Sequence, residues 1–215
     1  PNITRELLEQ CLRDGGDVLD LMGVFPVTGG ESFFVPAGTV HAIGAGALLA
    51  EIQQNSNITY RLFDYNRLGK DGRPRELHLE KGLQAARFQE TPTGPSTPLR
   101  VEEGGVTRAF LAACGYFAAE KVWPNGRRDY TGPAGSFHIL LSLEETIVLE
   151  GNASTCPVER AEAVLVPASM PGWHVVGQGA YLEYYVPDLN EDVIQPLRRH
   201  GYSDAQIRQL GGALA

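Results

Sequence analysis

The chain has 215 residues, a formal net charge of −8 and a sequence pI of about 5.1. Because no run rich in Lys or Arg interrupts this acidic composition, a nucleic-acid or anionic-membrane partner is not expected. No apolar run approaches the ~20 residues that span a bilayer, and three scattered cysteines, Cys11, Cys114 and Cys156, do not make a disulfide framework. These features favour a reduced, cytoplasmic protein. The high content of glycine and proline favours a turn-rich, mainly β chain.

The first part of the chain predicts helices at its two ends and strands between them. Apolar residues fall on one face of residues 2–13, which predicts an amphipathic helix that ends at the Gly15-Gly16 pair. Residues 32–35, 47–54 and 57–64 are typical of strands, and the helical period returns over residues 78–88.

A proline-rich stretch, residues 90–98, is the best candidate for a linker between domains. After it come seven short strand-like runs, which favour a β-sandwich or barrel. They cover residues 106–111, 116–122, 135–143, 145–150, 163–166, 173–176 and 180–186. The tail predicts a helix over Ser203–Leu210 with Ser203 as its N-cap. We therefore expect domains at residues 1–89 and 90–187, followed by a helical tail at 188–215.

The best candidate for a metal ligand is His41. It follows a Pro36-x-Gly38-x-x-His41 turn, in which glycine supplies backbone freedom and the next strand can aim the imidazole inward. A neutral histidine on a rigid strand suits Zn, Fe or Mn. The spacing from Gly30 to His41 is that of the second cupin motif, although Ala45 stands where that motif often has Asn.

The residues that follow resemble the short bacterial form of type I mannose-6-phosphate isomerase. The similarity rests on His41-Ala42-Ile43-Gly44, Glu51, Gln54-Asn55-Ser56, Thr59-Tyr60-Arg61 and Asp64-Tyr65-Asn66-Arg67, and it extends to Arg75–Lys81. It covers about residues 24–88 closely. The resemblance implies a mainly β fold of two cupin-like jelly-roll barrels, the first incomplete, with a few helices.

The resemblance also implies a zinc-dependent aldose–ketose isomerase that interconverts mannose 6-phosphate and fructose 6-phosphate. It implies one zinc held by a Gln, two His and a Glu, of which this chain supplies His41. The other three precede this region in the family, and residues 1–30 contain no His. We therefore expect residues 1–89 to be the C-terminal part of a catalytic cupin domain, in a chain that lacks the family's N-terminal part.

Two further residues are candidates for catalysis. Isomerisation moves a proton between C1 and C2 of the sugar, and a carboxylate can carry it, which makes Glu51 a candidate for this role. A guanidinium can stabilise the negative enediolate, which makes Arg61 the second candidate. The structural alternatives are a surface position for Glu51 and an ion pair with Asp64 for Arg61. Lys70, Arg73 and Arg75 are interpreted as a solvated loop rather than as phosphate ligands.

The second β domain repeats the Val-Pro-Ala sequence at residues 166–168. His174 lies seven residues after Pro167, however, whereas His41 lies five residues after Pro36. His138 is isolated in the sequence. We therefore expect a cupin-like barrel without a metal, and a second metal site at His174 is the alternative.

Partners and rival functions follow from the same residues. The expected partners are a small sugar phosphate and either the missing N-terminal segment or a second copy in a homodimer. The rival function is a non-catalytic cupin-type protein that binds a sugar or sugar phosphate. A third reading, an epimerase or dioxygenase of cupin type, lacks the two-His-plus-carboxylate set it needs.

Overall fold

The computed structural model describes residues 3–56, 58–65, 67–88, 94–131, 135–151 and 154–211. The chain divides into two compact units, which are described separately below. The first contains Pro1–Glu31, Val35–Leu49 and Asn55–Gly94, and the second contains Ser32–Phe34, Ala50–Gln54 and Pro95–Ala215.

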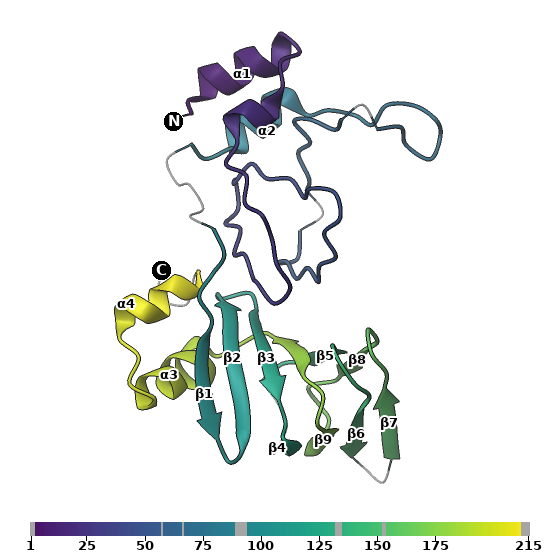
Figure 1. Ribbon diagram of the computed structural model, residues 1–215, viewed down its shortest axis with the longest axis vertical. Coiled ribbons are helices and arrows are strands. Elements are labelled where there is room, and N and C mark those ends of the chain that lie inside the picture. The colour runs from purple at the N-terminus through teal and green to yellow at the C-terminus, as the bar shows by residue number, and fades with distance from the viewer. Residues whose placement is uncertain are drawn as a thin grey trace. The chain divides into compact units, whose positions relative to one another are not determined.

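In the described residues of the second unit the chain forms ten strands (Figure 1). They are β1 (Leu99–Glu103), β2 (Val106–Ala113), β3 (Ala118–Trp123), β4 (Gly126–Tyr130), β5 (His138–Ser142), β6 (Ile147–Gly151), β7 (Ser154–Val158), β8 (Ala163–Val166), β9 (Trp173–Gly177) and β10 (Tyr181–Tyr185). They form a six-stranded sheet in the order β1-β2-β3-β10-β5-β8 and a four-stranded sheet in the order β4-β9-β6-β7. Every pairing is antiparallel, so the prediction of a mainly β chain is confirmed.

A shared apolar core joins the two sheets. Successive side chains of a strand point to opposite faces, so each strand lends every second residue to this core. Val122, Leu140 and Tyr181 from the six-stranded sheet pack with Ile147 and other buried residues of the four-stranded sheet. All four side chains named here have no exposed area.

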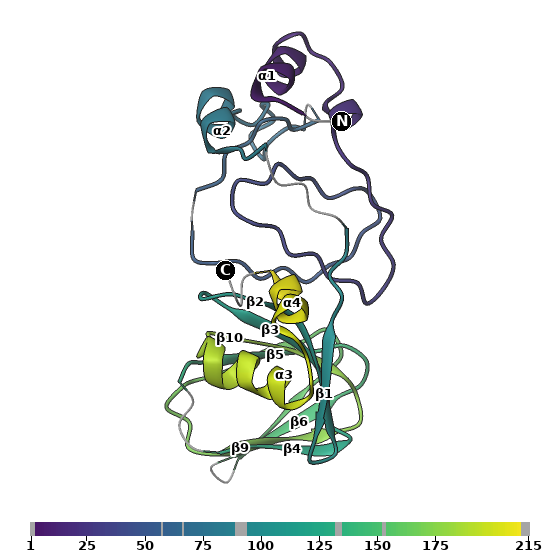
Figure 2. The ribbon, with the colours of Figure 1, turned by 90° about the vertical axis from the view of Figure 1, so that its left-hand side faces the viewer.

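The C-terminal helices pack on the β1–β2 side of the six-stranded sheet (Figure 2). They are the π-helix η2 (Leu189–Ile194), α3 (Gln195–Arg199), α4 (Asp204–Ile207) and the 3-10 helix η3 (Arg208–Leu210). Leu197 and Ile207 are fully buried against this sheet. Ser203 caps α4 through a capping box with Gln206, which confirms the predicted N-cap.

The first unit has a small core built by three helical segments. They are α1 (Arg5–Arg13), the 3-10 helix η1 (Val18–Leu21) and α2 (Leu79–Ala85). Leu8 of α1, Val18 of η1 and Leu83 of α2 are buried together with Leu62. None of the helices in the described part of the chain is long and apolar enough to cross a membrane.

The strands predicted for the first part of the chain are not present. The described residues of 32–35, 47–54 and 57–64 have no strand assignment, and many of their apolar side chains, such as Leu48 and Ile58, are exposed. A strand needs a ladder of backbone hydrogen bonds to a neighbour, and the described residues give these segments only isolated ones, such as the His78 N–H to the Arg61 carbonyl and the Ser96 N–H to the Ser32 carbonyl. The helices at both ends of this region and all seven strands predicted after the linker are confirmed, each within a few residues.

Candidate functional site

Asp64 is buried and charged, and it closes a turn in the first unit. The Arg67 N–H donates to the Asp64 carbonyl at 2.9 Å, and Tyr65 between them adopts a φ of 52°. This left-handed residue reverses the chain, so Arg67 Nη2 reaches Asp64 Oδ1 at 2.8 Å.

A short hairpin returns a second arginine to the same carboxylate. Leu68 and Pro74 form an antiparallel bridge, and the Gly69 N–H donates to the Arg73 carbonyl at 2.7 Å. Arg75 Nε then donates to Asp64 Oδ2 at 2.6 Å, and Arg75 Nη2 donates to Oδ1. The second contact makes this pair bidentate, which is the strongest geometry for a guanidinium and a carboxylate.

Arg61 is held at both its backbone and its side chain. The His78 N–H donates to the Arg61 carbonyl at 2.7 Å, and the Arg61 N–H donates to His78 Nδ1 at 3.2 Å. Arg61 Nη1 donates to the Glu76 carbonyl at 3.1 Å, while its Nε lies 3.8 Å from Asp64 Oδ1. The ion pair with Asp64 that the sequence suggested is therefore present, and one quarter of the Arg61 side chain stays exposed.

These contacts fix the charge of Asp64. Hydrogen bonding from Arg75 lowers its pKa to about 2; burial opposes this effect and Arg67 adds to it. Asp64 is therefore ionised at neutral pH, and three guanidinium groups share one negative charge.

His41 lies on the turn that the sequence predicts. The Thr39 N–H donates to the Pro36 carbonyl at 3.1 Å, and Gly38 between them has a φ of 86°. His41 itself is exposed, and its Nδ1 lies 2.9 Å from the Thr39 carbonyl. Since a carbonyl only accepts, Nδ1 is the donor in this contact, and Nε2 is the ring nitrogen left for a metal.

The described residues do not complete a zinc centre around His41. They contain no group of three or more His, Cys, Asp or Glu side chains that could hold a metal ion. A zinc site normally closes with three or four protein ligands. The assignment of His41 as a zinc ligand therefore stays a prediction.

Glu51 is exposed and belongs to the second unit, whereas His41 and Arg61 belong to the first. None of the hydrogen bonds or ion pairs found among the described residues joins any two of these three side chains. Their assignment to one site stays a prediction.

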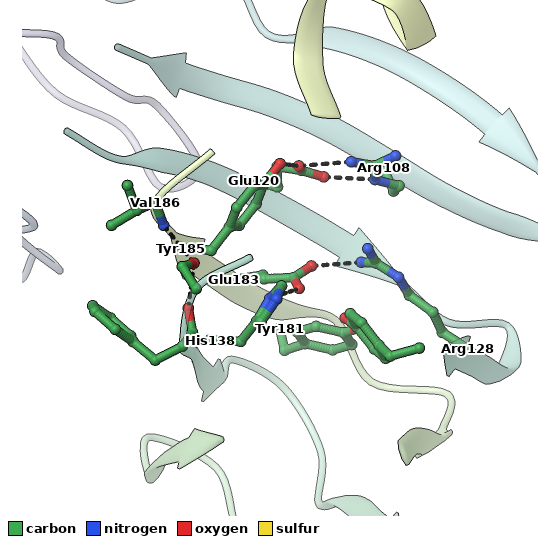
Figure 3. Close-up of polar contacts among 11 residues, drawn as sticks. Arg108, Glu120, Arg128, His138, Tyr181, Glu183, Tyr185 and Val186 are labelled. Atoms are coloured by element: carbon green, nitrogen blue, oxygen red, sulfur yellow. Dashed lines mark hydrogen bonds and ion pairs between the residues drawn. The ribbon is translucent and has the colours of Figure 1, made fainter. Parts of the chain in front are cut away.

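The second unit contains a buried polar cluster that sequence reasoning missed (Figure 3). Glu120 on β3 accepts from Arg108 on β2 at 2.7 and 2.8 Å, and the Tyr185 hydroxyl also donates to it. Arg108 and Glu120 point into the space between the sheets, because they occupy the inward positions of their strands. The sequence did contain an indication of this burial: Glu120 alternates with the apolar residues Ala118 and Val122, so all three side chains share one face of the strand.

The other half of this cluster contains His138, which is isolated in the sequence but has a charged partner in the fold. Glu183 on β10 accepts from Arg128 on β4 at 2.6 Å, and His138 Nδ1 on β5 lies 2.8 Å from its other oxygen. Burial raises the pKa of Glu183, but Arg128 and His138 outweigh that effect and hold it below its ordinary value. His138 gains this partner through the pairing of β5 with β10, which its own sequence neighbours do not reveal.

His174 has a simpler environment. It lies on β9 opposite Glu150 of β6, and its Nε2 is 2.6 Å from Glu150 Oε2. The part of the chain that the structure describes places no further metal-ligating groups with this pair.

The second unit is mainly antiparallel β structure. The first unit contains helices and three arginines that contact the Asp64 carboxylate. No family model matches the chain, but individual proteins do. It is 31% identical to the mannose-6-phosphate isomerase of Streptococcus mutans over 87% of its own length and 57% of that protein. It is 41% identical to the mannose-6-phosphate isomerase ManA of Bacillus subtilis over 55% of its length and 37% of that protein.

A solved structure supports the same relationship. The crystal structure of the mannose 6-phosphate isomerase from Bacillus subtilis superposes with a TM-score of 0.74 and 31% identity, covering 84% of this chain and 57% of that one. The chain belongs to the mannose-6-phosphate isomerase family. The chain spans only about half the length of curated relatives such as the Streptococcus mutans protein, although these matches cover most of the chain itself.

Proposed function

We propose that this chain contributes to a zinc-dependent isomerase that interconverts mannose 6-phosphate and fructose 6-phosphate. The observation that carries the proposal is the similarity to mannose-6-phosphate isomerases in both sequence and structure. The same relationship supports two cupin-like jelly-roll barrels, the first of them incomplete in these 215 residues. It also supports a sugar phosphate as the substrate.

The roles of the chain's own residues follow from the chemistry of isomerisation. The reaction moves a proton between C1 and C2 through an enediol, and negative charge develops on oxygen. Glu51 carries that proton, since an exposed carboxylate is free to accept and return it. Arg61 stabilises the oxygen that becomes negative, and its contacts with Glu76 and Asp64 hold its guanidinium in place before the substrate binds.

Zinc is the metal that the family relationship implies, and we assign one of its ligands to His41. The described residues supply no full ligand set, so the remaining donors are proposed to come from polypeptide outside these 215 residues. We accordingly expect the chain alone to bind zinc weakly and to show little isomerase activity.

A chimera tests the proposal directly. In it, this chain replaces the matching portion of the Bacillus subtilis enzyme, and a coupled assay measures fructose 6-phosphate formed from mannose 6-phosphate. We expect turnover by the chimera, and its loss in His41→Ala, Glu51→Gln and Arg61→Gln. The control is His200→Ala, whose ring contacts backbone carbonyls of the C-terminal helices and β1.

Two results would contradict the proposal. A chimera that folds and binds zinc but forms no fructose 6-phosphate removes the isomerase assignment. Robust turnover by the 215-residue chain alone removes the view that the zinc site needs residues from elsewhere.

The alternative is a protein that binds a sugar phosphate without converting it. Because the described residues contain no group of three or more His, Cys, Asp or Glu side chains that could hold a metal ion, the isolated chain fits this alternative. It predicts saturable binding of mannose 6-phosphate by a folded chimera that shows no turnover.

A further inference from the structure

Three arginines of the first unit surround the Asp64 carboxylate, which accepts from only some of their N–H donors. The side chains of Arg61, Arg67 and Arg75 are 25%, 63% and 37% exposed, whereas that of Asp64 is 6% exposed. The carboxylate is therefore covered, while the Arg67 and Arg75 side chains keep more than a third of their surface in solvent.

Each of these guanidinium groups keeps a donor that has no acceptor. Arg67 and Arg75 bind Asp64 through Nε and Nη2, which leaves Nη1 of both unpaired among the described residues. Arg61 uses Nη1 on the Glu76 carbonyl, which leaves its Nη2 without an acceptor in the same part of the chain. The unpaired donors belong to three residues that contact the same carboxylate.

The surrounding charge favours an anion. Residues 61–76 contain five Lys or Arg and three Asp or Glu, although the whole chain has a formal net charge of −8. Asp71 accepts from the Arg73 backbone N–H, and among the described residues it forms no ion pair with the three arginines. A local excess of positive charge in an acidic protein attracts anions and raises their association rate.

The arginines are also held in place before any ligand binds. The Arg67 guanidinium lies over the Tyr65 ring at 5.9 Å, and that ring packs edge-on against Phe63 with centroids 4.9 Å apart. Hydrogen bonds of the 68–74 hairpin fix the return of the chain to Arg75. Restricting these long side chains in advance lowers the entropy that a ligand must offset.

We propose that Arg67 and Arg75, gathered by Asp64 beside Arg61, form the site that binds the phosphate group of a phosphate monoester. This inference rests on the proposed function for the identity of the ester, a sugar phosphate, and on the geometry for the phosphate itself. Guanidinium groups bind phosphate oxygens through paired N–H donors, and the unpaired donors here supply that contact. Arg75, which the sequence places in a solvated loop, belongs to the site, while Arg73 and Lys70 do not.

Phosphate binding by the 215-residue chain tests the proposal. Inorganic phosphate is titrated into the protein at low ionic strength and followed by calorimetry and by the side-chain Nε–H signals of arginine in NMR spectra. We expect saturable binding that shifts the Arg67 and Arg75 signals. Arg67→Gln and Arg75→Gln should each weaken phosphate binding by roughly tenfold, as expected for one charge-assisted hydrogen-bond donor group.

Arg73→Gln is the matched control, because it removes the same charge from the same hairpin without touching Asp64. It should change phosphate affinity by less than about twofold, the effect of a screened surface charge. If Arg75→Gln disturbs the fold, Arg67→Lys and Arg75→Lys keep the charge and remove the planar fork, and they should still weaken binding. Equal losses in Arg73→Gln and Arg75→Gln, or no saturable binding by the unaltered chain, would overturn the proposed site.

The chimera separates this inference from the proposed function. Turnover with an unchanged KM for mannose 6-phosphate in Arg67→Gln would leave the isomerase standing and overturn the phosphate site. Phosphate binding that depends on Arg67 and Arg75, together with a chimera that shows no turnover, would support the phosphate site and remove the isomerase assignment.

Discussion

Glu120 and Glu183 lie directly opposite each other on β3 and β10, and neither side chain has any exposed area. Like charges in that position normally destabilise a sheet. Here each carboxylate has its own guanidinium, Arg108 for Glu120 and Arg128 for Glu183. The interior of the second unit therefore holds two ion pairs rather than two unpaired charges.

Removing one cation from this interior should be costly. We expect Arg128→Gln to reduce the free energy of unfolding by about 3–5 kcal/mol, because it leaves the Glu183 carboxylate buried and without its main cation. Arg127→Gln is the control on the same strand: its ion pair with Asp129 is exposed, so it should cost less than about 1 kcal/mol. Urea unfolding followed by Trp123 and Trp173 fluorescence measures both.

The double variant Arg128→Met/Glu183→Leu extends that test. Replacing both partners by apolar residues removes the unpaired charge and should recover much of the lost stability. A single Arg128→Gln that unfolds at the same urea concentration as Arg127→Gln would show that the buried pair does not stabilise the second unit.

The glycine before His41 should be hard to replace. A Cβ at Gly38 would lie 2.7 Å from the Ala85 carbonyl oxygen, and the φ of 86° already disfavours any other residue. Gly46 has a similar φ of 83° but nothing within 4 Å of its Cβ position, which makes Gly46→Ala the matched control. We expect Gly38→Ala to destabilise the first unit by about 1–3 kcal/mol more than Gly46→Ala, the cost of the added clash.

Amide hydrogen exchange in α2 reports that difference, because the Arg87 N–H donates to the Gly38 carbonyl next to the end of this helix. Equal exchange rates in the two variants would mean that the turn can move away from Ala85 at no cost.

The first unit should lose stability in acid through Asp64. Its pKa falls from an ordinary 3.8 to about 2 in the folded chain, so folding favours the ionised form. This contribution is fully present above about pH 4 and is lost as the pH falls through about 2. In Asp64→Asn, the amide protection factors near Arg61 and His78, which compare each rate with that of an unfolded chain at the same pH, should no longer respond to pH in that window.

Asp71→Asn is the control for this pH dependence, since the Asp71 carboxylate accepts from a backbone N–H and binds no guanidinium. A pH response that survives in Asp64→Asn and disappears in Asp71→Asn would contradict the prediction.

Replacing His138 should reduce the free energy of unfolding, whereas replacing His41 should leave it almost unchanged. His138 is half-buried and bonded to Glu183, so His138→Ala should cost about 1–3 kcal/mol by leaving a buried acceptor short of a donor. His41 is exposed, and His41→Ala should change the free energy of unfolding by less than about 0.5 kcal/mol. Comparable losses in both variants, measured by urea unfolding, would show that His41 is a structural residue.

Local patterns in the sequence were sufficient for many elements of the fold. Strands β2, β5 and β10 follow from apolar residues between turn residues, and Ser203 follows from the chemistry of helix caps. The strands β1, β4 and β7 were missed, because charged residues make up most of β1 and β4 and Pro157 in β7 does not fit an apolar pattern. The strands predicted at 47–54 and 57–64 have suitable residues, but strand formation also requires a partner strand.

The candidate site divides in the same way. The sequence by itself determined the family resemblance, the turn that carries His41 and the suggestion that Arg61 meets Asp64, because these depend on residues close together in the chain. Only the tertiary structure decided that Arg75 returns to Asp64 and that Glu120 and Glu183 face each other. Those contacts join residues 11 and 63 positions apart, and the second also depends on strand register. A shift of register by one residue would turn the side chains of that strand to the opposite face.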